Sequence, residues 1–118
     1  MGITHSKITL KSTPTSMGVP IVLMVDSGAD YSVVPKSVLQ SLGIEPRRRV
    51  TIVLADGTRR ERMVGDLYYQ FEDLLAPAPV IFGEDGDEPM LGVVTLEALG
   101  LLLDPLRRMI SRRETLRM

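Results

Sequence analysis

The sequence predicts a mainly β domain that carries one or two short helices. Short apolar runs rich in β-branched residues recur along the chain, for example at 21–25 and 50–54, and such runs are typical of strands. Asp56-Gly57 stands between two extended segments, which is a strong signal for a β-hairpin. Helical spacing of apolar residues is confined to short stretches near 36–42 and 95–99.

The elements follow from local patterns taken in chain order. The strands that we expect cover residues 3–10, 19–25, 50–54, 66–71 and 78–82, followed by an apolar strand that starts at Met90. Pro35 and Gly43 are the expected start and stop signals of the first helix. Thr95 is the expected N-cap of the second helix. A proline-containing loop is expected at 75–79, because proline cannot donate to a sheet ladder.

Length and composition limit the chemistry that the chain can carry. The 118 residues fit one domain over 1–118, and 44% apolar residues suffice for a core. The chain has no cysteine and one histidine, His5, so disulfides, thiol nucleophiles, a Ser-His-Asp triad and histidine-rich zinc sites lack material. We therefore expect no metal or cofactor, and any catalysis falls to carboxylates.

Charge and hydropathy also limit the partners. A formal net charge of −1 and the absence of Trp argue against nucleic-acid binding. No apolar run approaches the roughly 20 residues of a membrane span, and no secretory signal is visible, so we expect no membrane partner and a cytoplasmic location. The acidic stretch 83–88 fits a solvated turn better than a calcium loop, whose ligand spacing it lacks.

Asp26 stands out because it ends an apolar run and precedes Ser27 and Gly28. Asp is seldom buried without a partner, so an acid at the end of a core strand needs a local reason. One reason is an Asx-type turn, in which Asp26 only accepts backbone N–H bonds. The other is a functional carboxylate delivered into a tight turn.

The run 21–35 resembles the active-site loop of the aspartic proteases, in the single-domain, retropepsin-like and bacterial-type branch. Met90-Leu91-Gly92 and the helix after it are similar to the second signature of that family, about 65 residues further on. The resemblance covers residues 19–105 and implies a small closed β-barrel of the acid-protease type with one or two short helices. Residues 106–118 would be a C-terminal strand and a basic tail.

The resemblance also implies roles for the loop. Asp26 would be the catalytic acid and base, Ser27 a hydroxyl that bonds across a subunit interface, and Gly28 a turn residue that lets water and substrate approach. Ala29 and Asp30 would line the substrate cleft.

By position, the hairpin around 55–64 matches the family's flap, a mobile lid over bound substrate. Ala55, Asp56, Gly57 and Thr58 would then contact substrate. The tip is so polar that an ordinary surface hairpin remains the alternative.

Peptide hydrolysis without metal, thiol or histidine requires two carboxylates that share a proton, and the chain supplies one such motif. We therefore expect a homodimer that hydrolyses a peptide or protein substrate as an aspartic endopeptidase, with one Asp26 from each subunit. The alternatives are a catalytically silent retropepsin-like module that binds peptides or dimerises a partner, and a small β-barrel interaction domain unrelated to proteases.

Overall fold

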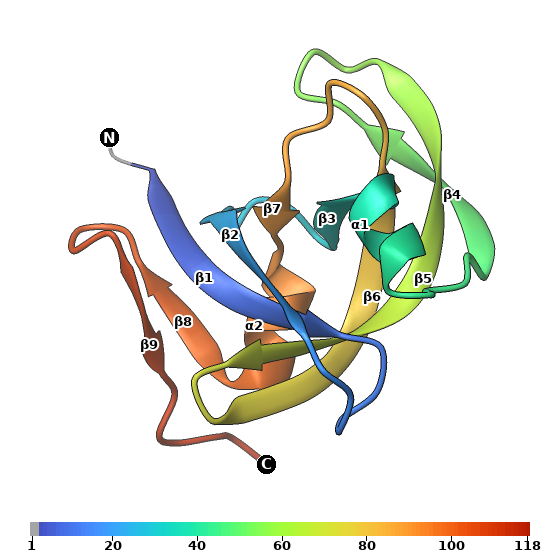
Figure 1. Ribbon diagram of the computed structural model, residues 1–118. Coiled ribbons are helices and arrows are strands. Elements are labelled where there is room, and N and C mark those ends of the chain that lie inside the picture. Colours follow the sequence, from blue (N-terminus) through green and yellow to red (C-terminus); the bar gives the residue numbers. More distant parts are fainter. Residues whose placement is uncertain (1–2) are drawn as a thin grey trace.

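Strands make up about half of the chain in the computed structural model, which describes residues 3–118 (Figure 1). Residues 1–2 of the expected domain lie outside the described part. The elements are β1 (Thr4–Lys11), β2 (Val19–Val25), β3 (Ser32–Pro35), α1 (Lys36–Ser41), β4 (Arg48–Val53), β5 (Arg59–Phe71), β6 (Leu74–Gly83), β7 (Met90–Leu91), α2 (Val93–Leu99), β8 (Leu101–Asp104) and β9 (Met109–Arg112). The prediction of a mainly β domain with two short helices is confirmed.

Seven strands form one sheet in the order β1-β2-β7-β3-β6-β5-β4. β1 also pairs with β5, from Thr9 opposite Gln70 to Lys11 opposite Tyr68, so that the sheet returns on itself. The enclosed side chains are apolar and fully buried, among them Leu23, Val34, Val80 and Leu91 at 0% exposure. Two of the pairings, β2 with β7 and β3 with β6, are parallel and bring distant parts of the chain to one place.

The expected loop at 75–79 is wrong. Strand β6 runs through this segment and pairs with β5 along its whole length, from Phe71 opposite Leu74 to Val64 opposite Ile81. Prolines are tolerated here because β6 gains its second neighbour, β3, only from Val80 onward. Before that point one edge of β6 is free, and a missing N–H on a free edge costs no ladder bond.

The two helices meet the predictions differently. α1 begins directly after Pro35 and is followed by Gly43 at a φ of 76°, as expected. α2 begins three residues earlier than expected, with Gly92 at its N-cap, so the assignment of Thr95 as N-cap is wrong. Thr95 is instead fully buried in the first turn of the helix. A buried hydroxyl needs a hydrogen-bond partner, and the Thr95 hydroxyl has one in Ser32.

The last two strands form a separate two-stranded sheet, β8–β9, which lies beside β1 (Figure 1). Within residues 3–118 both helices are far shorter than a membrane span, and no helix has the length and hydropathy to cross a bilayer.

Candidate active site

The loop that joins β2 to β3 begins with Asp26, immediately after the buried Val25. The Asp26 N–H donates to the carbonyl of Leu91 at 3.0 Å, and Val25 pairs with Leu91 in the parallel β2–β7 ladder. Both signatures identified in the sequence therefore meet at one point of the sheet. Asp26 itself is half-buried, which leaves its carboxylate accessible.

Asp26 also organises its own turn. Gly28 donates its N–H to Asp26 Oδ1 at 2.8 Å, and Ala29 donates to the Asp26 carbonyl at 3.2 Å. A Cβ at Gly28 would lie 3.2 Å from Oδ1, so a side chain there would crowd the carboxylate. The Asx turn considered from the sequence is thus present. It occupies one carboxylate oxygen and orients the other, so the turn and a functional carboxylate are compatible. Ser27 next to it is exposed.

Gly92 allows the loop to pack directly on the start of α2. A Cβ at this position would lie 2.6 Å from the carbonyl carbon of Tyr31 and 2.7 Å from the carbonyl oxygen of Asp30. Both distances are far below van der Waals contact. The φ of Gly92, −93°, would suit any residue. Glycine is therefore required here by the close approach of the two backbones and not by its conformational freedom.

The first N–H groups of α2 hold the far side of the loop. Val93 donates to the carbonyl of Ala29 at 2.8 Å, and Val94 donates to the carbonyl of Asp30 at 3.0 Å. These N–H groups have no partner inside the helix, so the loop carbonyls satisfy them. Ala29 is half-buried and Asp30 is exposed, which is compatible with the predicted place of both beside a substrate.

Three buried hydroxyl groups lie behind the loop, and sequence reasoning did not identify them as a group. Ser32 Oγ accepts from the Gly92 N–H at 2.9 Å and lies 2.6 Å from Thr95 Oγ1. The Tyr69 hydroxyl donates to the carbonyl of Pro79 at 3.0 Å. Burial raises the pKa of Tyr69, against the opposing effect of the Ser32 and Thr95 hydroxyls. These groups fix loop and helix in one arrangement. The sequence signal that could have indicated them is a Ser or Thr next to apolar residues, as Ser32 is beside Val33 and Thr95 beside Val94.

A shallow hollow of about 220 Å³ opens beside Asp26. It is lined by Ile3, Thr4, Met24, Val25, Asp26, Leu103 and Pro105. A larger hollow of about 420 Å³ lies along β1 and the β5–β6 turn and has Glu72 as its acidic residue. Volume alone would favour the larger one. We place the candidate site at Asp26, whose carboxylate opens into the smaller hollow directly after the buried end of β2.

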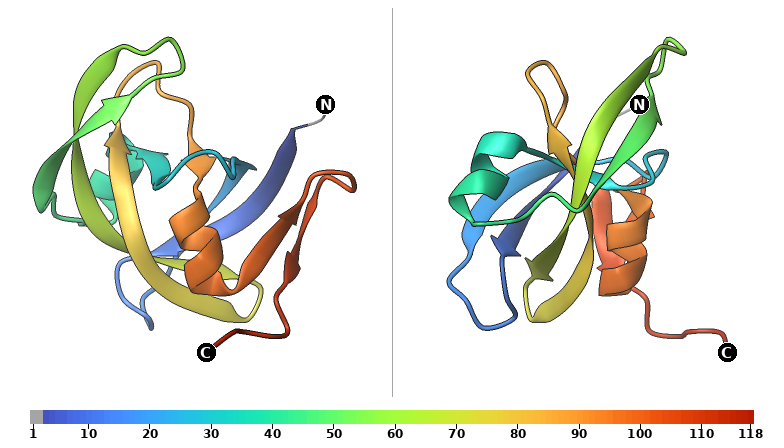
Figure 2. Two further views of the ribbon diagram at one scale, coloured as in Figure 1. Left: turned by 180° about the vertical axis from the view of Figure 1, so that it is seen from behind. Right: turned by 90° about the vertical axis from the view of Figure 1, so that its right-hand side faces the viewer.

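The predicted flap is a hairpin of β4 and β5 that projects away from the sheet (Figure 1). The side view shows its tip rising above the loop that joins β2 to β3, on the same side of the molecule (Figure 2). Ala55, Asp56, Gly57 and Thr58 are exposed at the tip. Thr58 donates to Asp56 Oδ1 through both its Oγ1 and its N–H, and these two bonds lower the pKa of Asp56.

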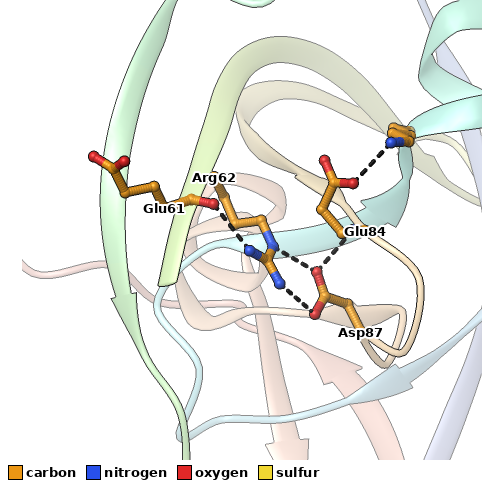
Figure 3. Close-up of polar contacts among 5 residues, drawn as sticks. Glu61, Arg62, Glu84 and Asp87 are labelled. Carbon is orange, nitrogen blue, oxygen red and sulfur yellow. Dashed lines mark hydrogen bonds and ion pairs between the residues drawn. The ribbon is translucent and has the colours of Figure 1, made fainter. Parts of the chain in front are cut away.

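Two arginines on one face of the hairpin attach it to the rest of the site. Arg62 binds Asp87 through two parallel hydrogen bonds of 2.7 and 2.9 Å (Figure 3). Both side chains are largely buried, at 11% and 16% exposure. Arg48 donates to the Tyr31 hydroxyl at 3.0 Å. The hairpin is thus tied to the loop before β7 through Arg62 and to the loop after Asp26 through Arg48.

The acidic stretch 83–88 is a turn whose acids are partly neutralised within the chain. Glu84 forms an ion pair with Lys36 at 2.7 Å, and Asp87 accepts the Glu84 N–H at 2.8 Å besides binding Arg62 (Figure 3). Within residues 3–118 no group of three or more His, Cys, Asp or Glu side chains is placed to hold a metal ion. The Arg62–Asp87 pair could not be found from the sequence, because the two residues are far apart and each has several charged neighbours.

The fold and the Asp-Ser-Gly loop define a retropepsin-like aspartic protease domain. The structure is similar to that of EIAV protease in complex with the inhibitor HBY-793, with a TM-score of 0.58 and 19% identity over 84% of this chain and 89% of that chain. Residues 15–98 match the family described as gag-polyprotein putative aspartyl protease. The chain belongs to this family, which excludes the unrelated interaction domain. A search of curated proteins finds no match.

Proposed function

We propose that the protein is an aspartic endopeptidase that works as a homodimer and hydrolyses a peptide or protein substrate. The observation that carries the proposal is Asp26, held at the end of a buried strand by Leu91 and with one carboxylate oxygen oriented by Gly28. The carboxylate would act on a water molecule between itself and a second carboxylate. One of the pair accepts the proton from the attacking water, and the other donates a proton to the leaving nitrogen.

We infer that the second carboxylate comes from another copy of the chain. Asp56 is engaged by Thr58 at the hairpin tip, and Asp87 is engaged by Arg62. Neither follows a buried strand. A twofold axis beside Asp26 would bring together two identical loops, since a C2 interface joins the same patch on both subunits. Ser27, which is exposed beside Asp26, is then available to bond across that axis.

The surface beside Asp26 supports this assembly. The hollow next to the carboxylate is lined by the start of β1 and by Leu103 and Pro105 of the β8–β9 hairpin. Apolar side chains around it are exposed, including Ile3 at 62%, Leu106 at 93% and Met109 at 50%. Burying such side chains is favourable at roughly 25 cal/mol per Å² of apolar surface. A second copy of the chain would cover these side chains and would also supply the second Asp26 carboxylate.

The test is Asp26→Asn, which keeps the shape of the side chain and removes its ability to exchange a proton. We expect peptidase activity to fall by orders of magnitude with little change in stability, measured by mass spectrometry of a digested peptide pool. Asp66→Asn is the matched control, because Asp66 is an exposed acid that pairs with Arg47 on the surface. Cleavage by the Asp26→Asn chain at the parent's rate contradicts the mechanism.

Assembly is tested with the same reagents. Specific activity is expected to fall on dilution, and an excess of the Asp26→Asn chain is expected to inhibit the parent by forming mixed dimers. A monomer in sedimentation that keeps constant specific activity contradicts the dimer. A stable, peptide-binding dimer that cleaves nothing identifies the catalytically silent module.

A further inference from the structure

We propose that Arg60 on the hairpin selects substrates with an acidic side chain, Asp or Glu, within a few residues of the cleaved bond. The proposal rests on the proposed peptidase function and specifies the substrate class of that site. It starts from the uneven distribution of charge. The chain has a formal net charge of −1, whereas its segment 47–62 contains six arginines against two acids.

The register of the hairpin decides which of these arginines face the site. Arg60 is opposite Ile52 and Arg62 is opposite Val50 in the β4–β5 ladder. Side chains alternate between the two faces of a strand, and directly opposed residues share a face. Arg60, Arg62 and Arg48 therefore lie on one face, and Arg59 and Glu61 lie on the other. Figure 3 shows the alternation directly: Arg62 points toward Asp87, and Glu61 points away from it.

The face with Arg60 is the one that looks into the site. Arg62 reaches the loop before β7, and Arg48 reaches Tyr31, which follows Asp30 in the loop that holds Asp26. Arg60 lies two residues nearer the tip than Arg62, a distance of about 7 Å along a strand. Closure of the hairpin over the cleft would therefore bring this face, with Arg60, toward the loop after Asp26.

Arg60 differs from its two neighbours on this face in its bonds. The guanidinium of Arg60 donates to the backbone carbonyl of Arg59 at 2.9 Å, and within residues 3–118 it forms no ion pair. Arg62 is already matched by Asp87, whereas Arg48 donates to the neutral Tyr31 hydroxyl and lies over the Tyr31 ring, 5.8 Å from its centroid. Arg60 thus has donors available to a bound molecule and, unlike Arg48, is not held against a side chain of the loop after Asp26.

A carboxylate is the group that such a guanidinium recognises best, because two parallel N–H donors match its two oxygens. Closure of a lid excludes water, which strengthens the attraction between the two charges. In the proposed dimer the twofold axis would bring two hairpins over one cleft, so that two Arg60 side chains offer this contact. An acidic peptide fits this arrangement, and a peptide with a basic residue in the same place is repelled.

Binding tests the proposal separately from catalysis. The Asp26→Asn chain is immobilised and exposed to a random peptide library, and bound peptides are sequenced. We expect enrichment of Asp and Glu at one or two positions. A matched pair of peptides that differ by Glu against Gln is expected to differ about ten- to hundredfold in affinity, as for a hydrogen bond to a charged group. Adding Arg60→Glu is expected to abolish that preference and to favour Lys and Arg.

Arg59→Glu is the matched control, because it makes the same charge change on the other face of the same strand. Acid enrichment that is absent, or that is lost equally with Arg59→Glu, overturns the proposal. A dimer that dissociates with Arg60→Glu in sedimentation also overturns it, since Arg60 would then pair with an acid of the second copy. Acid-selective binding without any cleavage by the Asp26-containing parent supports the proposal and contradicts the peptidase function.

Discussion

Gly92→Ala tests whether the fit between α2 and the loop after Asp26 controls both stability and activity. A methyl group at Gly92 would lie 2.6 Å from the Tyr31 carbonyl carbon and 2.7 Å from two backbone oxygens, those of Asp30 and Tyr31. An ordinary contact needs more than about 3.4 Å, so these backbone atoms have to move by most of an ångström. These three nearest atoms all belong to the backbone, which yields less easily than a flexible side chain.

The cost follows from that geometry. Overpacking a tightly filled interior typically costs about 1–3 kcal/mol, and contact with three backbone atoms of Asp30 and Tyr31 places this substitution near the upper end, at about 3 kcal/mol. For a domain of this size that corresponds to a fall of about 10–15 °C in Tm. The bonds from Val93 to Ala29 and from Val94 to Asp30 are expected to lengthen as the loop is pushed away.

The assay combines thermal unfolding with hydrogen exchange at Val93 and Val94, and with peptidase activity below the Tm. Gly43→Ala is the control, because a Cβ at Gly43 meets nothing within 4 Å and the change costs only the positive φ, about 1 kcal/mol. We expect Gly92→Ala to lose activity per folded molecule and Gly43→Ala to keep it. A Gly92→Ala protein that melts like the parent, with unchanged exchange at these amides, refutes the reasoning.

Three further predictions concern other contacts of the site. Thr95→Val removes a buried partner of Ser32 while keeping the volume, and is expected to cost about 1–3 kcal/mol in urea unfolding, with Ser32→Ala as comparison. Equal stability of parent and mutant would contradict it. The hydrogen bonds from Arg62 lower the pKa of Asp87. The stability that this pair contributes is therefore complete above the unfolded pKa of about 3.9 and is lost as pH falls through the lower folded value. Asp87→Asn is expected to remove that part of the acid dependence in unfolding measured from neutral pH downward, and an unchanged slope would refute this. Finally, a peptidic aspartic-protease inhibitor is expected to slow hydrogen exchange over 55–64; unchanged exchange there would identify an ordinary surface hairpin.

Local rules were sufficient for much of this fold. Apolar runs located most of the strands, and Pro35 with Gly43 located α1, because these signals depend on neighbours in sequence. The Asp26 loop was recognisable because a buried strand, an acid, a hydroxyl and a glycine follow one another. The cytoplasmic location remains a prediction.

Tertiary context decided the features that the sequence did not predict correctly. Strand β6 runs through Pro77 and Pro79 because one of its edges is free there, and no local rule contains that information. Thr95 was a reasonable N-cap by residue type, but Ser32 across the core determines its place. The Arg62–Asp87 pair depends on the register of the hairpin.

Strand β5 joins the hairpin tip to the wall of the sheet without a break, from Arg59 to Phe71. Its inner part is closely packed: a Cβ at Gly65 would lie 2.8 Å from the Glu45 carbonyl oxygen. Any lifting of the tip is therefore restricted to residues on the outer side of Val64. The two ends of β5 therefore differ in how freely their residues can be substituted. If the proposed function holds, exposed positions between the tip and Arg62 are free to change and to alter which peptides bind, whereas Arg62 and the positions from Val64 inward are constrained by folding.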